Sequence, residues 1–196
     1  TMTKHSIARL AGFNYLLLVI TGIFYLMYAP TQFVVWSDPA ATANNIINGE
    51  FLFRLWIIVS IISNIVFLIL PFVLYMLFES VNRTCAALMV ILSAVSIPFS
   101  LAYATNLLDI LTLLSGDQYL NTMENAQIHT QIMLALKSYF NGMAIVLVFW
   151  GLWLFPFGYL VYQSNFLPKI FGIALMLGCF SYLLKFTSRI LFPEFD

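Results

Sequence analysis

The sequence predicts an all-α integral membrane protein with five transmembrane helices. Hydrophobic residues make up 62% of the 196 residues and charged residues 8%, whereas a soluble domain carries about 25% charged residues. The mean hydropathy is +0.96. The apolar residues form five runs, each long enough to cross a hydrocarbon layer of roughly 30 Å. Residues 1–196 are therefore expected to form a single transmembrane helical domain.

The first span is expected over residues 7–28, directly after Lys4, His5 and Arg9. A basic head before an apolar run is typical of a signal peptide, but this run is longer than the apolar part of such a peptide, and no small-residue cleavage site follows it. Residues 30–50 form a loop. Within it, Asp38 is a suitable N-cap for a short interfacial helix over AATANNIING.

The second and third spans are expected over residues 51–78 and 84–114, with Pro71 and Pro98 inside them. A proline inside a helix removes a hydrogen bond and favours a kink. Residues 115–136 are too polar at first to span a membrane. They are expected to form a loop and a short amphipathic stretch that merges with the fourth span.

The fourth and fifth spans, residues 137–162 and 168–192, are joined by a short elbow with the sequence QSNFL. Pro168 is placed in the first turn of the last helix, where proline is well tolerated. Helical spacing puts Asn141, Gly151 and Gly158 on one face of the fourth span. The inward face of the fifth span is expected to carry Ala174, Gly178, Ser181, Lys185 and Ser188.

The loops divide into a basic and an acidic set, which predicts the orientation. Lys and Arg residues gather on the cytoplasmic side of membrane proteins. The N-terminus is therefore expected in the cytoplasm, and the protein in the cell inner (plasma) membrane as a multi-pass protein. Charges are few and sum to zero, so the basic cluster that nucleic-acid binding requires is missing. The basic side holds Lys4, Arg9, Arg83 and Lys169, and the acidic side Asp38, Glu50, Asp117, Glu124, Glu194 and Asp196.

Ionisable residues inside or at the edge of spans predict the candidate site, because such residues are usually functional. At a rise of 1.5 Å per residue, Asp109 and Lys185 lie roughly 8 to 11 Å inside the outer interface. The sequence therefore predicts a polar cavity open to the outer side that binds or moves a small or lipid-like molecule. The excess of cations favours an anionic ligand. The expected ligand-binding residues are Arg54, Asn106, Asp109, Lys137, Asn141, Lys185 and Arg189.

Two alternatives to a binding cavity stay open. An intramembrane enzyme acting on a lipid would place the same charges around a nucleophile or base with a shifted pKa. A non-catalytic membrane subunit or scaffold would instead seal Asp109 in an ion pair between helices and present a face to a second copy or a partner subunit. No metal or other cofactor is expected, because the histidines, His5 and His129, lie in the terminus and in a loop. The tryptophans are interpreted as lipid-facing or interfacial-belt residues.

The chain also resembles a known family. ARLAGFNYLLLVITGIF, AATANNII followed by FLFRLWI, VNRT, and FWGLWLFPFGYLVYQSNFLPKIFGIAL are similar to segments of the bacterial DUF4386 family of multispan membrane proteins. The similarity runs from Ala8 to Pro193. It implies no assigned reaction and no catalytic residues. Family members usually continue into a sixth span after the LFP at residues 191–193, so the resemblance implies a short or truncated member.

Overall fold

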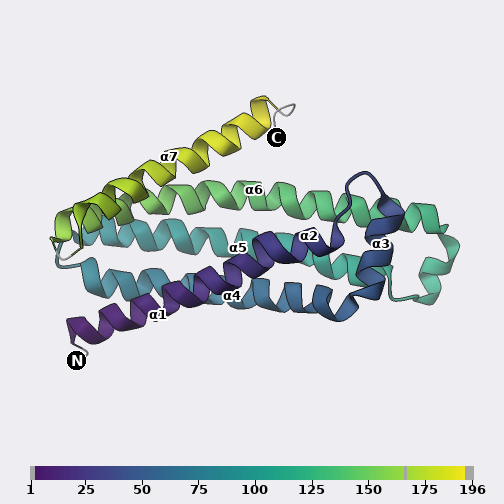
Figure 1. The fold of residues 1–196 in the computed structure, drawn as a ribbon, viewed down its shortest axis with the longest axis horizontal. Coiled ribbons are helices and arrows are strands. Elements are labelled where there is room, and N and C mark those ends of the chain that lie inside the picture. Colours follow the sequence, from purple (N-terminus) through teal and green to yellow (C-terminus); the bar gives the residue numbers. More distant parts are fainter. Residues whose placement is uncertain (1–2, 166, 193–196) are drawn as a thin grey trace.

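A computed structural model of the chain describes residues 3–165 and 167–192, except for the side chains of residues 119 and 121, and it is helical throughout. Five helical segments are long and apolar enough to cross a membrane, which confirms the predicted helical class (Figure 1). The long segments are α1 (Lys4–Gly22) with its extensions η1 (Ile23–Tyr28) and α2 (Ala29–Phe33), α4 (Glu50–Phe78), α5 (Arg83–Leu113), α6 (Asn125–Ser164) and α7 (Lys169–Leu191); the short ones are α3 (Pro39–Asn48) and η2 (Gln118–Thr122).

The first long segment continues to Phe33, five residues beyond the predicted end, and its turns over Ile23–Tyr28 are π-helical. Pro30 lies just after this segment and has no N–H to donate. The Ala29 N–H bonds to the carbonyl of Phe24, five residues earlier. The helix therefore passes the proline by widening its preceding turns.

The predicted interfacial helix is present as α3, which lies across the ends of the long helices (Figure 1). Asp38 Oδ1 accepts a hydrogen bond from the Ala41 N–H at 2.9 Å, so the expected N-cap is confirmed. Thr42 then holds the preceding loop, because its hydroxyl accepts from the Val35 N–H and donates to the Val35 carbonyl. These bonds fix the connection between the first and second spans.

The fourth span is the C-terminal part of a longer helix, α6, which has 40 residues and a length of about 60 Å. Its N-terminus carries a capping box, in which Glu124 and Gln127 satisfy each other's backbone N–H groups. The expected merging of the amphipathic stretch with this span is confirmed.

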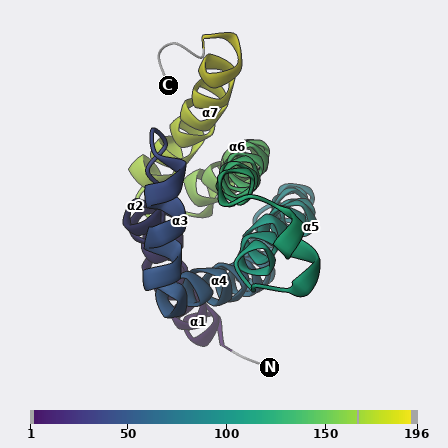
Figure 2. The same ribbon diagram turned by 90° about the vertical axis from the view of Figure 1, so that its right-hand side faces the viewer.

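The helices α4, α5, α6 and α7 follow one another in space, each packed on the next, and α1 packs on α4 (Figure 2). Because α5 lies between α4 and α6, these two approach each other mainly through aromatic rings. The ring centroids are 5.7 Å apart for Trp56 and Tyr139 and 5.2 Å apart for Phe67 and Trp153. Large rings thus hold α4 and α6 apart along their length.

The contact between α6 and α7 is closest at two glycines. A Cβ atom on Gly158 would lie 2.6 Å from the carbonyl oxygen of Gly172, so the inward face predicted for the fourth span is confirmed at Gly158. The face predicted for the fifth span is wrong: Gly172 and Cys179 are the buried residues of α7. The backbone approach at Gly172 determines which side of α7 packs, whereas the prediction followed small and polar residues.

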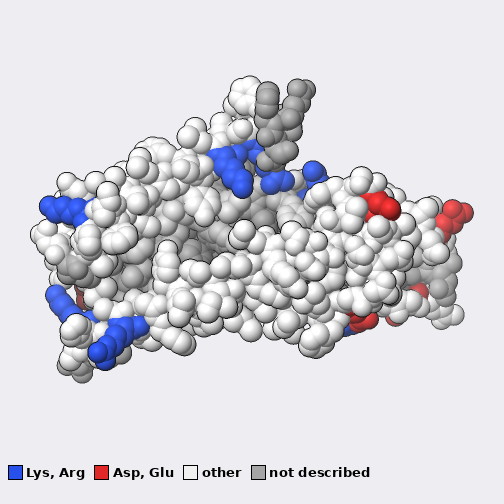
Figure 3. All heavy atoms as spheres, in the orientation of Figure 1, with Lys and Arg blue, Asp and Glu red and all other residues white. Residues whose placement is uncertain are grey.

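The two ends of the bundle differ in charge. The N-terminus and the α4–α5 and α6–α7 turns lie at one end, and the remaining connections lie at the other (Figure 1). Basic side chains gather at the first end and acidic ones at the second (Figure 3). The expectation about a further span after the LFP concerns residues from 193 onward, which lie outside the described residues.

Candidate functional site

A cavity of about 190 Å³ lies near the middle of the bundle, among α1, η1, α4, α6 and α7. One of its residues, Asn64, stands midway between Glu50 and Phe78, the ends of α4, and so roughly 21 Å from each. The cavity therefore lies at the depth of the hydrocarbon centre for a bundle that crosses a membrane. Six aromatic residues line it, namely Tyr15, Tyr25, Phe67, Trp150, Trp153 and Tyr182.

The cavity exists because large rings and a glycine meet at this level. Phe67 packs edge to face against Trp150 at 5.7 Å and against Trp153 at 5.2 Å, which holds both indoles in place. On α1, Gly22 has no side chain, and a Cβ atom there would meet nothing within 4 Å. The rings thus form one wall, and the missing side chain leaves the space open.

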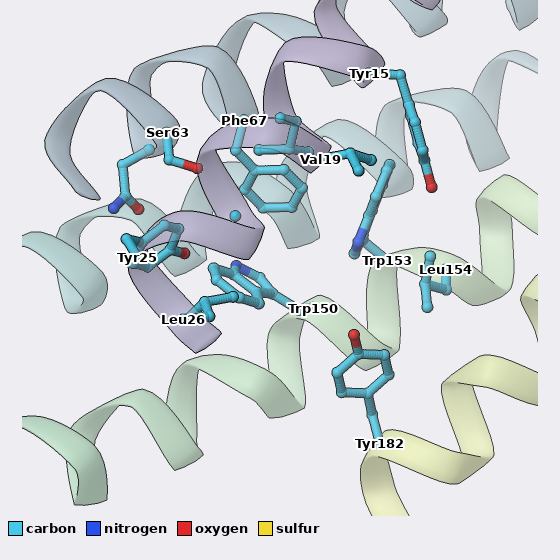
Figure 4. Close-up of a pocket in the computed structure, with 13 residues that line it drawn as sticks. Tyr15, Val19, Tyr25, Leu26, Ser63, Phe67, Trp150, Trp153, Leu154 and Tyr182 are labelled. Atoms are coloured by element: carbon cyan, nitrogen blue, oxygen red, sulfur yellow. The ribbon is translucent and has the colours of Figure 1, made fainter. Parts of the chain in front are cut away.

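The π-helical segment contributes Tyr25 and Leu26 to the lining. Tyr25 is only 3% exposed, and Figure 4 shows its hydroxyl and that of Ser63 directed toward the space beside Phe67 and Trp150. Thr21 donates to Ser63 Oγ at 3.1 Å and so ties α1 to α4. Local π-helical turns occur often at functional sites, and here the turn aims a tyrosine at the cavity.

Two of the lining residues carry buried polar atoms that lack a hydrogen-bond partner in the described part of the chain, Asn64 Oδ1 and Trp150 Nε1. The Asn64 amide nitrogen donates to the Ser60 carbonyl at 2.8 Å, which leaves its oxygen as the unpaired group. An unpaired buried polar atom costs about 1 to 3 kcal/mol. Asn64 thus carries an unpaired acceptor and Trp150 an unpaired donor, both covered by neighbouring side chains at the level of the cavity.

The lining contains no Lys, Arg, His, Asp or Glu side chain. None of the seven residues predicted to bind a ligand belongs to it. Within the described residues, no three His, Cys, Asp or Glu side chains come together as a metal site requires. The chemistry of this cavity is that of rings, hydroxyls and amides.

The structure distributes the seven predicted residues over three places. Arg54 lies on the surface of α4 and pairs with Glu50 one turn earlier, at 2.6 Å. Asn106 and Asp109 border a shallow pocket between α5 and α6. This pocket is separate from the ion pair and from the aromatic cavity.

The remaining four predicted residues lie where α7 diverges from α6. Arg189 donates to Asn141 Oδ1 at 3.2 Å, and the Lys137 amino group lies 5.4 Å from the centre of the Trp36 ring. Lys185 is exposed, one turn before Arg189 on α7, and Figure 3 shows basic side chains along this part of the molecule.

Asp109 and Lys185 are not brought together, because α5 and α7 pack on different sides of α6 (Figure 2). Between described residues the one ion pair is that of Arg54 with Glu50. The sealed pair expected of a scaffold is therefore not formed by Asp109 and Lys185. A role of the seven residues in ligand binding stays a prediction.

A family profile with the description "Domain of unknown function (DUF4386)" matches residues 10–196. The chain belongs to the DUF4386 family. The resemblance inferred from the sequence segments is thereby confirmed. No curated protein and no solved structure matches the chain. The candidate site of this DUF4386 protein therefore rests on geometry.

Sequence reasoning missed the aromatic cavity because it assigned the tryptophans to the lipid surface and the interfacial belts. Trp56 and Trp153 are 0% and 4% exposed, so this assignment is wrong for both. The signal was available for Trp150, which stands in the centre of the predicted span 137–162. Belt residues lie at the ends of a span, so a tryptophan at its centre favours packing or a site.

Proposed function

We propose that this DUF4386 protein binds a small or lipid-like molecule in the aromatic cavity at the middle of the bundle. The observation that carries the proposal is the combination of a cavity of about 190 Å³ with unpaired buried polar atoms on two of its residues, Asn64 and Trp150. Ligand pockets are typically apolar and aromatic, with a few well-placed polar groups. This cavity has that composition.

The ligand enters from the lipid rather than from water. The helix α1 packs on α4, and α7 packs on α6; Figure 3 shows this face of the molecule hollowed between α1 and α7. The hollow lies at mid-span depth, so it faces the hydrocarbon of the surrounding bilayer. A molecule that reaches the cavity this way must dissolve in the membrane.

The proposal also covers the orientation of the protein and the membrane that holds it. The concentration of Lys and Arg at the end that holds the N-terminus (Figure 3) supports an N-terminus in the cytoplasm. The five candidate spans make the protein multi-pass, and the cell inner (plasma) membrane is the proposed location. The bilayer is then the partner of the apolar surface, and a second copy or a partner subunit stays an alternative.

Two rival functions receive less support. A lipid-directed enzyme needs a nucleophile with a base or another activating group, and the residues around the cavity include no His, Lys or carboxylate. A scaffold requires no cavity at all. Binding therefore accounts for more of the described features than either rival.

A second candidate ligand site concerns an anion, as the sequence predicts. Arg189 donates to Asn141 across the gap between α6 and α7, and Lys137 lies one turn from Asn141 on the same helix. A lipid phosphate would suit these side chains. Arg54, Asn106 and Asp109 lie elsewhere and do not contribute to this arrangement.

The main proposal is tested by purifying the protein gently from its own membrane and identifying co-purifying molecules by mass spectrometry. A Gly22→Phe variant places a ring into the cavity, where a Cβ atom meets nothing within 4 Å. Gly12→Phe is the matched control, because Gly12 lies on the same helix with equally open surroundings and does not line the cavity. Wild type and the control are expected to carry an enriched species that Gly22→Phe loses.

The proposal fails if all three proteins carry the same bulk lipids in the same proportions. Both substitutions replace a glycine within α1 by the same residue, so their effects on helix propensity are similar. A difference between them therefore reports the cavity rather than the stability of α1.

A further inference from the structure

We infer that the ligand of the aromatic cavity is an uncharged ring that carries a hydroxyl group, such as the phenol-type head of a membrane-soluble molecule. This inference rests on the proposed function and specifies the ligand class. Four properties of the cavity support it: its volume, its walls, its lack of charge and the two unpaired polar atoms.

The volume suits a single ring. An apolar cavity of about 150 Å³ is large enough to bind benzene, and the cavity here measures about 190 Å³. One six-membered ring with small substituents therefore fits this space. Any longer tail must extend through the hollow between α1 and α7 into the lipid.

The walls favour an aromatic ring over a simple chain. Phe67, Trp150 and Trp153 already interact in edge-to-face geometry, with interplanar angles of 67° and 82°. Aromatic pairs in such geometries gain more than their buried area alone provides. Tyr182 approaches from the opposite side, with its hydroxyl directed toward Trp150 and Trp153 (Figure 4). A ligand ring would therefore meet rings on several sides.

The polar atoms select a hydroxyl. Asn64 Oδ1 lacks a donor and the Trp150 N–H lacks an acceptor, and a hydroxyl group can donate to the first or accept from the second. Both atoms are covered by neighbouring side chains, so a small side-chain rotation must accompany binding. A charged head is disfavoured, because no residue of opposite charge lines the cavity and an unpaired charge at mid-span depth is costly.

Three probes of nearly equal size separate these contributions: 4-hexylphenol, 4-hexylanisole and hexylbenzene. The phenol donates and accepts, the anisole only accepts, and hexylbenzene does neither. Their binding is measured by native mass spectrometry on protein in phosphatidylcholine nanodiscs, with empty nanodiscs as the blank for partitioning. The expected order of affinity is phenol, anisole, hexylbenzene, with a loss of about tenfold at each step.

Two substitutions assign each step to its residue. Trp150→Phe keeps a ring but removes the N–H, so it should abolish the advantage of the anisole over hexylbenzene. Asn64→Leu removes the acceptor, so it should abolish the advantage of the phenol over the anisole. Trp153→Phe is the control, because Trp153 lines the same cavity and its N–H is not among the unpaired atoms; the full order should survive in it.

The outcomes distinguish the inference from the proposed function. Equal affinity for all three probes, lost in Gly22→Phe, would overturn the hydroxyl assignment while leaving the cavity as a binding site; a bound water that satisfies both polar atoms would produce this result. No binding of any probe, or probe binding that Gly22→Phe leaves unchanged, would overturn the inference about the ligand class. The proposed function itself is overturned only if co-purification finds the same bulk lipids in wild type, Gly22→Phe and Gly12→Phe. If one of the two variants does not fold, the other still assigns its own step.

Discussion

The two ends of the contact between α6 and α7 are built in opposite ways. At one end the backbones meet at Gly158 and Gly172, so closely that a Cβ atom on either glycine would lie 2.6 Å from the other's carbonyl oxygen. At the other end one hydrogen bond of 3.2 Å joins the exposed side chains of Asn141 and Arg189. Between the two ends, α7 diverges from α6 (Figure 1).

This difference shows how the bundle combines a firm contact with an opening. Glycine lets two helices approach without any polar group, so the crossing point needs no ion pair. The divergence that follows leaves Tyr182 beside Gly151, where a Cβ atom would lie 2.6 Å from Tyr182 Cβ, and Tyr182 lines the cavity. The crossing point at Gly158 and Gly172 thus positions one wall of the site. The polar end, at Asn141 and Arg189, contributes less to the packing of α7 on α6.

The largest effect is expected at the crossing point. Gly158→Ala adds a Cβ atom that meets backbone, which cannot move aside as a flexible side chain can, so the contact should lose about 1 to 3 kcal/mol. The measurement is the rate at which a thiol reagent labels Cys179, which is buried on α7, in a Cys85→Ser background. A loss of this size should accelerate labelling roughly fivefold to 150-fold.

Gly178→Ala provides the control on the partner helix. Its Cβ atom would meet only Leu154 at 3.5 Å, an ordinary contact, and alanine favours helix over glycine by about 0.5 to 1 kcal/mol. Labelling of Cys179 in this variant should therefore be unchanged or slower. Equal acceleration in both variants would show that glycine itself, rather than the backbone approach, matters at these positions.

A smaller effect is expected at the polar end. Asn141→Ala removes the acceptor of the Arg189 bond, which is exposed, so the stability should fall by about 0.5 to 1 kcal/mol. Cys179 labelling should then accelerate less than in Gly158→Ala. Ser138→Ala, an exposed position one turn away on α6, is the control. An effect of Asn141→Ala as large as that of Gly158→Ala would show that the polar end also holds the helix pair together.

The same comparison explains what the sequence could predict. The long helices and the cap at Asp38 depend on local features, namely apolar length and a side chain next to a helix start, and these were predicted. The face of α7 and the cavity depend on where helices cross and on which rings hold α4 and α6 apart. Depth along a span gives no information about the order of helices around a bundle, so Asp109 and Lys185 were placed together although α6 lies between their helices.

The smallest effect is expected for Arg54, which the sequence predicts as a ligand residue. Its ion pair with Glu50 stays within one helix, and both side chains are more than half exposed. An acid four residues before a base on an exposed helix stabilises by about 0.2 to 0.5 kcal/mol, and salt weakens the effect. A double-mutant cycle with Arg54→Ala and Glu50→Ala on thermal unfolding in detergent should give a coupling of this size at low salt and almost none at high salt. The coupling does not test ligand binding, which the co-purification experiment measures separately. If Arg54→Ala removed the co-purifying molecule, Arg54 would belong to a ligand site even though it does not line the aromatic cavity.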